Sequence, residues 1–279
     1  MLKIINRYTC RIDQLKQFTG QLKHKGFIPI IGKGNENIKN KHNNYIEMRK
    51  VIEENPNNMF ALKFSSLGID NDTLTTMEWS RNILKTTVKN NSIMTIDLEH
   101  AYQNHRIVYL TDRLMSEFNN NKPIIYKTYQ MYRKDSLDML SYDLTKDRDY
   151  VLGIKLVRGA YYNSDKRTQE LFANIEDTHK SYNKGIDVFV DNCKPEDRMI
   201  CATHNYDSIE YAKKLIDENQ LENISFAQLM GMSDNYSEKL AKDGYVVYKY
   251  LPYGNFIETI PYLLRRLYEN YPLLIKLFH

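Results

Sequence analysis

Eight short runs of β-branched and aromatic residues recur along the chain, and segments with helical spacing lie between them. The runs are FIPII from residue 27, FALKFS from 60, IMTIDL from 93, PIIYKTY from 123, VLGIKLV from 151, RMICAT from 198, NISFAQL from 223 and YVVYKYL from 245. They predict strands. Residues 73–90, with Leu74, Met77 and Leu84, and residues 206–219, with Ile209, Ala212 and Ile216, predict amphipathic helices.

Alternation of strand and helix predicts parallel β-α units, because parallel strands need a crossover connection. Eight such units in 279 residues predict a distorted (β/α)8 TIM-type barrel, with a doubly wound open sheet as the alternative. No G-x-G-x-x-G follows the first strand, which disfavours a dinucleotide-binding sheet. Without a linker rich in Pro, Gly or Ser, residues 1–279 are predicted to form one domain, in which 1–26 is a short N-terminal extension. The polar segment 35–50 is predicted to be a loop.

Composition and charge narrow the class of protein. The net charge of +4 arises from 39 basic and 35 acidic residues with no basic tract, so nucleic acid binding is not indicated. No apolar run is long enough to cross a bilayer, and we expect a soluble protein. The cysteines Cys10, Cys193 and Cys201 lack paired spacing, which favours free thiols over disulfides or structural zinc. No targeting segment is seen at the N-terminus, and the predicted location is cytoplasmic.

Polar side chains gather where the predicted strands end, which is where a barrel places its active site. They are Lys63, Asp97, Glu99, Gln130, Lys155, Arg158, Thr203, His204, Asn205 and Tyr250. Each has an ordinary explanation when taken singly: Asp97 as a helix cap, His204 as a core histidine, Lys63 as a chain that reaches the surface. Together they predict a site, because buried charge is costly unless it is paired or used.

Two chemistries compete for this set. A hydrolytic metal site would use Asp97, Glu99, His100 and His204. Lys155 and Arg158 would repel a cation there, and no H-x-H or H-E-x-x-H spacing occurs. A site rich in Lys, Arg and Gln suits an anionic or electron-rich ligand, such as the pyrophosphate or the reduced ring of a flavin. We therefore expect no metal.

Eight motifs resemble, in the same order, those of the monofunctional FAD-dependent proline dehydrogenases. They are LKFSSLG at 62, TIDLEH at 95, YQMYRKDS at 129, IKLVRGAYY at 154, ATHN at 202, FAQLMGMSD at 226, YLPYG at 250 and YLLRRLYEN at 262. KLVRGAY followed by RRLYEN is the most diagnostic pair. The resemblance runs from the second predicted strand to the C-terminus, and the segment before Lys63 matches nothing in the pattern.

The resemblance implies a distorted (β/α)8 barrel with non-covalent FAD. Such an enzyme oxidises L-proline to Δ1-pyrroline-5-carboxylate by hydride transfer to flavin N5, and a quinone-type acceptor reoxidises the flavin. One alternative is a catalytically silent relative that binds flavin or proline, and another is the metal-dependent barrel hydrolase. Trp79 and the closing LLIKLFH could give a peripheral membrane contact, although an ordinary core helix is favoured. The oligomeric state is not predicted.

The resemblance also assigns roles to single residues. Asp97 and Lys155 would be catalytic, with Asp97 either accepting a proton or positioning a basic side chain. The substrate would contact Lys63, Leu229, Tyr250, Arg265, Arg266 and Glu269. The flavin would contact Leu98, Gln130, Lys155, Arg158, Gly159, Ala160, Thr203 and His204. Lys155 stands where many relatives have Arg, a change that loses bidentate geometry.

The arginine pair near the C-terminus has a geometric pattern of its own. Tyr262, Arg265, Arg266 and Glu269 are spaced i, i+3, i+4 and i+7 and would share one stripe of a helix. The ordinary explanation is a solvated face with an Arg265 to Glu269 pair. With the resemblance, we expect the two guanidinium groups to bind the carboxylate of proline, held by Glu269.

Overall fold

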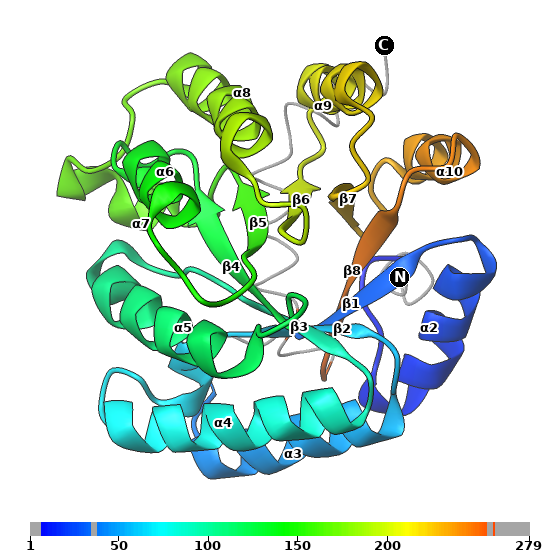
Figure 1. Cartoon of the computed structure of the whole chain (residues 1–279). Coiled ribbons are helices and arrows are strands. Elements are labelled where there is room, and N and C mark those ends of the chain that lie inside the picture. Colours follow the sequence, from blue (N-terminus) through cyan, green and yellow to red (C-terminus); the bar gives the residue numbers. More distant parts are fainter. Residues whose placement is uncertain (1–6, 35–37, 256–258, 260–279) are drawn as a thin grey trace.

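The computed structural model describes residues 7–34, 38–255 and 259. Their strands form one closed barrel in sequence order, with the helices outside it (Figure 1). The strands are β1 (Ile28–Lys33), β2 (Met59–Leu62), β3 (Ile93–Ile96), β4 (Ile125–Gln130), β5 (Gly153–Val157), β6 (Arg198–Ala202), β7 (Ile224–Leu229) and β8 (Val247–Tyr253). Each pairs in parallel with the next, and β1 pairs with β8. The eight predicted strands and the (β/α)8 barrel are confirmed, and the open sheet is excluded.

Helices cover the outside of the barrel between successive strands (Figure 1). The α-helices are α2 (Leu15–His24), α3 (Lys41–Glu54), α4 (Thr73–Lys89), α5 (Asn104–Phe118), α6 (Ser136–Thr145), α7 (Tyr162–Asp165), α8 (Ile175–Asn192), α9 (Tyr206–Asn219) and α10 (Asp234–Lys242). Short 3-10 helices are η1 (Ile12–Gln14), η2 (Phe64–Leu67), η3 (Ala101–Gln103) and η4 (Lys166–Thr168). The helices predicted over 73–90 and 206–219 are confirmed as α4 and α9. Asp72 and Asn205 begin them as N-caps, since each side chain accepts a backbone N–H of the first turn.

Two details of the helices differ from the prediction. Most of the segment predicted as a loop forms α3, whose buried Tyr45, Met48 and Ile52 pack against the barrel. Asn and Lys on the other face of α3 hide this apolar stripe in the sequence. Leu74 in α4 is 84 % exposed. Buried threonines take part of the face that packs on the barrel, because their hydroxyls donate to the carbonyl four residues earlier.

The apolar interior has two separate parts. The larger lies between strands and helices, and the smaller contains only strand residues and therefore fills the inside of the barrel. The inner group is Ile30, Met59, Ala61, Tyr126, Ile200, Ala227, Tyr248 and Tyr250. Because side chains alternate along a strand, this group shows which positions of each strand point inward.

Trp79, the candidate membrane contact on α4, is part of the packed helix layer. Its ring stacks on Tyr45 of α3, with 5.1 Å between centroids and 11° between planes. Trp79 therefore takes part in ordinary packing against the core, whereas LLIKLFH, the other part of that candidate contact, lies outside the described residues. Within the described residues, no helix is both long enough and apolar enough to span a membrane.

Candidate active site

The inward positions of the strands become polar at the carboxyl end of the barrel. Lys63 and Asp97 come two residues after the inward-facing Ala61 and Thr95, and Gln130 comes two after Thr128. The same register places Lys155 beside Thr128 and Leu229 beside Tyr250. Residues predicted from six strand ends therefore face one space, as parallel strands require when they close into a barrel.

An ion pair joins two of these side chains across the mouth of the barrel. Lys155 Nζ donates to Asp97 Oδ1 at 2.8 Å, and the two side chains are only 10 % and 14 % exposed. The same ammonium lies 5.7 Å from the centroid of the Tyr250 ring, within range of a cation-π contact. A cation, a carboxylate and an aromatic ring thus meet at one point. Asp97 binds Lys155 across the barrel and does not act as the helix cap that a lone Asp would suggest.

Gly32 on β1 makes room for Tyr250. A Cβ at Gly32 would lie 2.2 Å from Tyr250 Oη and 2.6 Å from Cζ, so no other residue fits without moving the ring. Sequence reasoning missed this residue. A glycine inside a strand is nevertheless a known signal of close approach.

Gln130 is the last residue of β4, and only the nitrogen of its side-chain amide is hydrogen-bonded within the described residues. Its Nε2 donates to the carbonyl oxygens of Leu98 at 2.9 Å and Glu99 at 3.2 Å. Its Oε1 is buried and has no hydrogen-bond partner among the described residues. A buried acceptor without a donor is costly, so this oxygen is suited to an N–H of a bound ligand. The Leu98 carbonyl is thus bonded to Gln130, and its predicted backbone contact with the flavin stays a prediction.

Among the described residues, Arg158, directly after β5, donates only to neutral groups. Its Nε donates to His179 Nδ1 at 2.9 Å, and its two terminal nitrogens donate to Thr203 Oγ1 at 2.6 Å and Ser208 Oγ at 2.8 Å. Its guanidinium carbon lies 4.3 Å from the centroid of the Tyr182 ring. Burial lowers the pKa of Arg158, although a guanidinium stays charged at any physiological pH.

Gly159 has a positive φ of 132°, and the ring of Tyr132 occupies the space that a side chain at this position would take. A Cβ there would lie 2.2 Å from ring atoms of Tyr132. The prediction that Gly159 and Ala160 allow a cofactor to approach therefore has a companion explanation at Gly159, which is the packing of Tyr132.

His204 and Leu229 meet at the ends of β6 and β7, where the backbone N–H of Leu229 donates to His204 Nε2 at 3.2 Å. The bond fixes the tautomer of His204, because the nitrogen that accepts is not protonated. A predicted cofactor residue and a predicted substrate residue are thereby linked.

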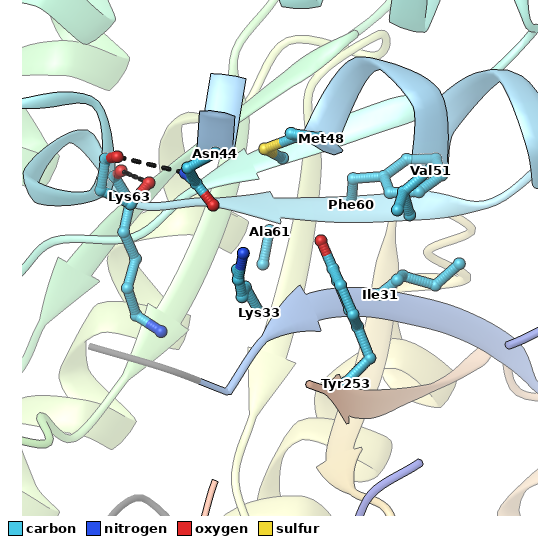
Figure 2. Close-up of a pocket in the computed structure, with 10 residues that line it drawn as sticks. Ile31, Lys33, Asn44, Met48, Val51, Phe60, Ala61, Lys63 and Tyr253 are labelled. Carbon is cyan, nitrogen blue, oxygen red and sulfur yellow. Dashed lines mark hydrogen bonds between the residues drawn. The ribbon is translucent and has the colours of Figure 1, made fainter. Parts of the chain in front are cut away.

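Lys63 lines a pocket between α3 and the ends of β1, β2 and β8, together with Lys33 and Tyr253. Figure 2 shows the Lys63 side chain extending away from its backbone. The Ser66 hydroxyl donates to the Lys63 carbonyl at 2.6 Å, and Asn44 Nδ2 donates to the Ser66 carbonyl at 3.1 Å. Glu99 lies nearby, buried, and accepts from the backbone N–H of Ser65 at 3.0 Å and from the Ser65 hydroxyl. Burial raises the pKa of Glu99, and the charge of Lys63 opposes that shift.

Three predicted site residues, Arg265, Arg266 and Glu269, lie outside the described residues. Residues that sequence reasoning missed are Gly32, Ser65, His179 and Ser208. The last two had no signal, since they sit inside α8 and α9 and find Arg158 only through the fold. In the described part of the chain, no group of three or more His, Cys, Asp or Glu is arranged to hold a metal. His100, a candidate metal ligand, instead contacts Asp165, with 3.3 Å between Nδ1 and Oδ1.

Comparison with known proteins identifies the family. The profile of the proline dehydrogenase family matches residues 5–272. Proline dehydrogenase 1 of Dictyostelium discoideum is 37 % identical over 193 residues, which cover 63 % of this chain and 34 % of that protein. Hydroxyproline dehydrogenase of Xenopus laevis is 34 % identical over 226 residues, 75 % of this chain and 48 % of that protein. The chain thus spans between about a third and a half of the length of these relatives.

Solved structures agree on the fold. Proline utilization A from Bdellovibrio bacteriovorus superposes with a TM-score of 0.85 over 96 % of this chain and 33 % of its own, at 17 % identity. The protein of the same name from Corynebacterium freiburgense gives 0.83 over 98 % of this chain and 32 % of its own, at 19 % identity. At this identity the comparison establishes the (β/α)8 architecture.

The predicted cytoplasmic location is wrong, as the names of the sequence relatives indicate. The relatives from Dictyostelium discoideum and Homo sapiens are both named mitochondrial. The prediction rested on the absence of a targeting segment in this sequence. A chain that spans 34 % and 32 % of those relatives does not report on the rest of their length.

Proposed function

The chain belongs to the proline dehydrogenase family, and on that premise we propose that it oxidises L-proline to Δ1-pyrroline-5-carboxylate. FAD, when bound, supplies the acceptor for the hydride that leaves the ring carbon next to nitrogen, and a quinone-type molecule then takes the electrons. The observation that carries the proposal is the Lys155 to Asp97 ion pair beside the Tyr250 ring at the mouth of the barrel. This arrangement places a charged pair next to an aromatic ring against which the proline ring could pack.

The described residues fit a flavin. Gln130 offers a buried oxygen with no donor among them, and Arg158 offers a charge that no carboxylate among them pairs. FAD carries both complements, ring N–H groups and an anionic pyrophosphate. Arg158, Gln130, Thr203 and His204 are therefore the residues that we assign to holding it.

Lys155 and Asp97 have different proposed roles, since Lys155 supplies a positive charge and Asp97 positions it. The Lys155 ammonium is a fixed positive charge that would stabilise the electron density gained by a bound flavin when it accepts the hydride, and preorganised charge of this kind often contributes more to catalysis than any other single effect. Asp97 holds that ammonium at 2.8 Å. Of the two roles open for Asp97, we therefore assign positioning, because one of its oxygens is already occupied by the lysine.

Tyr250 forms the apolar wall for the proline ring, and Gly32 sets its position. Gly32→Ala is expected to displace the Tyr250 ring, since the added Cβ would lie 2.2 Å from Oη. KM for L-proline should rise about tenfold, as expected for losing roughly 1.4 kcal/mol of packing, while the affinity for FAD changes little. Gly20→Ala is the matched control, because nothing lies within 4 Å of a Cβ at that glycine. An unchanged KM in Gly32→Ala would remove Tyr250 from the substrate site.

Arg265 and Arg266 remain the proposed ligands of the proline carboxylate. Arg265→Ala and Arg266→Ala are each expected to raise KM for L-proline by one to two orders of magnitude, because a charge-assisted contact contributes roughly 1.5 to 3 kcal/mol. FAD should stay bound, as its absorption spectrum will report. Wild-type KM in both variants would contradict the assignment.

Product analysis tests the proposed reaction. The FAD-loaded protein is incubated with L-proline and a soluble quinone, and the mixture is examined by mass spectrometry. The proposal predicts a product two hydrogens lighter than proline, formed with an equal amount of hydroquinone. Flavin that binds with no product after prolonged incubation would instead support the silent relative.

A further inference from the structure

Arg158 is a partly buried cation whose partners among the described residues are all neutral. Its three bonded nitrogens donate to an imidazole and two hydroxyls, and its fourth contact is the Tyr182 ring. No carboxylate pairs with it among the residues that the structure describes, whereas Arg148, which is buried more deeply with a side chain 1 % exposed, is paired with Asp197. A buried charge without a counterion is unfavourable unless a ligand supplies one.

These hydrogen bonds hold the Arg158 guanidinium in place, but their neutral acceptors do not neutralise its charge. Three of its five N–H donors are engaged, so two remain for a ligand. The three acceptors come from different elements, His179 from α8, Thr203 from the end of β6 and Ser208 from α9. Together they fix the plane of the guanidinium group.

His179 is the member of this set that could carry a charge. Its Nδ1 accepts from Arg158 Nε at 2.9 Å, so that nitrogen is unprotonated and the neutral ring carries its proton on Nε2. The charged groups that act on it are Glu176 of its own helix α8, Arg158 after β5 and Asp207 of α9. Burial and the charge of Arg158 lower the pKa of His179 and keep it neutral, while Glu176 and Asp207 oppose that shift.

We propose that His179 is a positioning residue of the cofactor site, which orients Arg158 as a neutral hydrogen-bond acceptor and leaves its positive charge to the pyrophosphate of FAD. A carboxylate at this position would hold the guanidinium equally well but would neutralise it. The anion would then meet a pair with no net charge. The inference rests on the proposed use of FAD and adds a residue that the resemblance does not assign.

The test separates the charge of residue 179 from its hydrogen bond. H179N keeps a neutral acceptor near the position of Nδ1, and H179E provides an acceptor that carries a negative charge. H24E is the matched control, since His24 is exposed at the end of α2 and the substitution changes the net charge by the same amount. Apo-protein is titrated with FAD, and the dissociation constant is read from the quenching of flavin fluorescence. Thermal unfolding of each variant verifies that it folds, and H179D replaces H179E if that variant does not.

We expect H179E to raise the FAD dissociation constant at least about tenfold and H179N to stay within about threefold of wild type. H24E should match wild type. Two results would overturn the inference: H179E binding FAD as tightly as H24E does, or H179N weakening binding as much as H179E. A wild type that binds no FAD would refute the proposed function as well. Tight FAD binding without proline oxidation would refute that function and leave this inference standing.

Discussion

Lys155→Met is expected to lower kcat/KM for L-proline by about two to three orders of magnitude, the usual cost of removing one preorganised electrostatic group from an active site. Methionine keeps the length of the side chain but removes the charge that lies 2.8 Å from Asp97 and beside the Tyr250 ring. Steady-state kinetics with a soluble acceptor measure the effect. A change in kcat larger than that in KM would place the charge in the transition state.

Lys155→Arg is the control for this variant, because it keeps the positive charge. We expect it to retain most of the activity, with a modest change from the different geometry of the guanidinium. Wild-type kcat/KM in Lys155→Met would contradict the role of the ion pair. Unfolding curves of both variants show whether a loss of activity comes from a loss of structure. This control is needed because Lys155→Met leaves the largely buried Asp97 carboxylate without its lysine.

Asp143→Asn should cause the largest loss of stability, about 3 to 5 kcal/mol in the free energy of unfolding. Asp143 on α6 is buried and accepts from Lys127 Nζ, Tyr129 Oη and Lys146 Nζ, each at 2.6 Å. Lys127 is 3 % exposed and would lose a buried counterion, although Asp112 stays 2.7 Å away. Urea unfolding at neutral pH measures the difference. Asp13→Asn, which removes an exposed ion pair with Arg11, is the control and should change stability little.

The same carboxylate predicts a pH dependence. Burial alone would raise the pKa of Asp143, but the charge of Lys127 and the hydrogen bonds from Lys127, Lys146 and Tyr129 outweigh burial and lower it. A lowered pKa in the folded state means that the group stabilises the fold above its ordinary pKa of about 3.9. This contribution is lost as the pH falls below that value and through the lowered pKa. The gap between wild type and Asp143→Asn should therefore narrow in acid, and a constant gap would show that the carboxylate is not charged in the folded protein.

The sequence was sufficient for the barrel because its strands repeat one signal. Six of the eight runs of β-branched and aromatic residues end in polar side chains, and parallel closure brings those side chains to a common mouth. Asp97 and Lys155 are far apart in the chain yet form an ion pair for this reason. α3 was missed because its buried face is narrow and its exposed face is rich in Asn and Lys. Leu74 was misplaced because threonines fill part of the buried face of α4.

The residues that hold Arg158 in place could not be predicted from the sequence. His179 and Ser208 lie on helices and act on Arg158 through tertiary contacts, for which no local pattern exists. Gly32 could have been found, since a glycine within a predicted strand indicates that another group approaches closely. The cytoplasmic prediction failed for a different reason, because it was drawn from not seeing a targeting segment, and the chain covers only about a third of the length of the relatives named mitochondrial.

Reduction of bound FAD by L-proline tests the central claim most directly. The protein is loaded with FAD, freed of oxygen and mixed with L-proline while the visible absorption of the flavin is recorded. We predict that the yellow colour bleaches in wild type and bleaches far more slowly in Lys155→Met. A protein that stays colourless when FAD is supplied, or a yellow protein whose absorption L-proline does not change, would contradict the account.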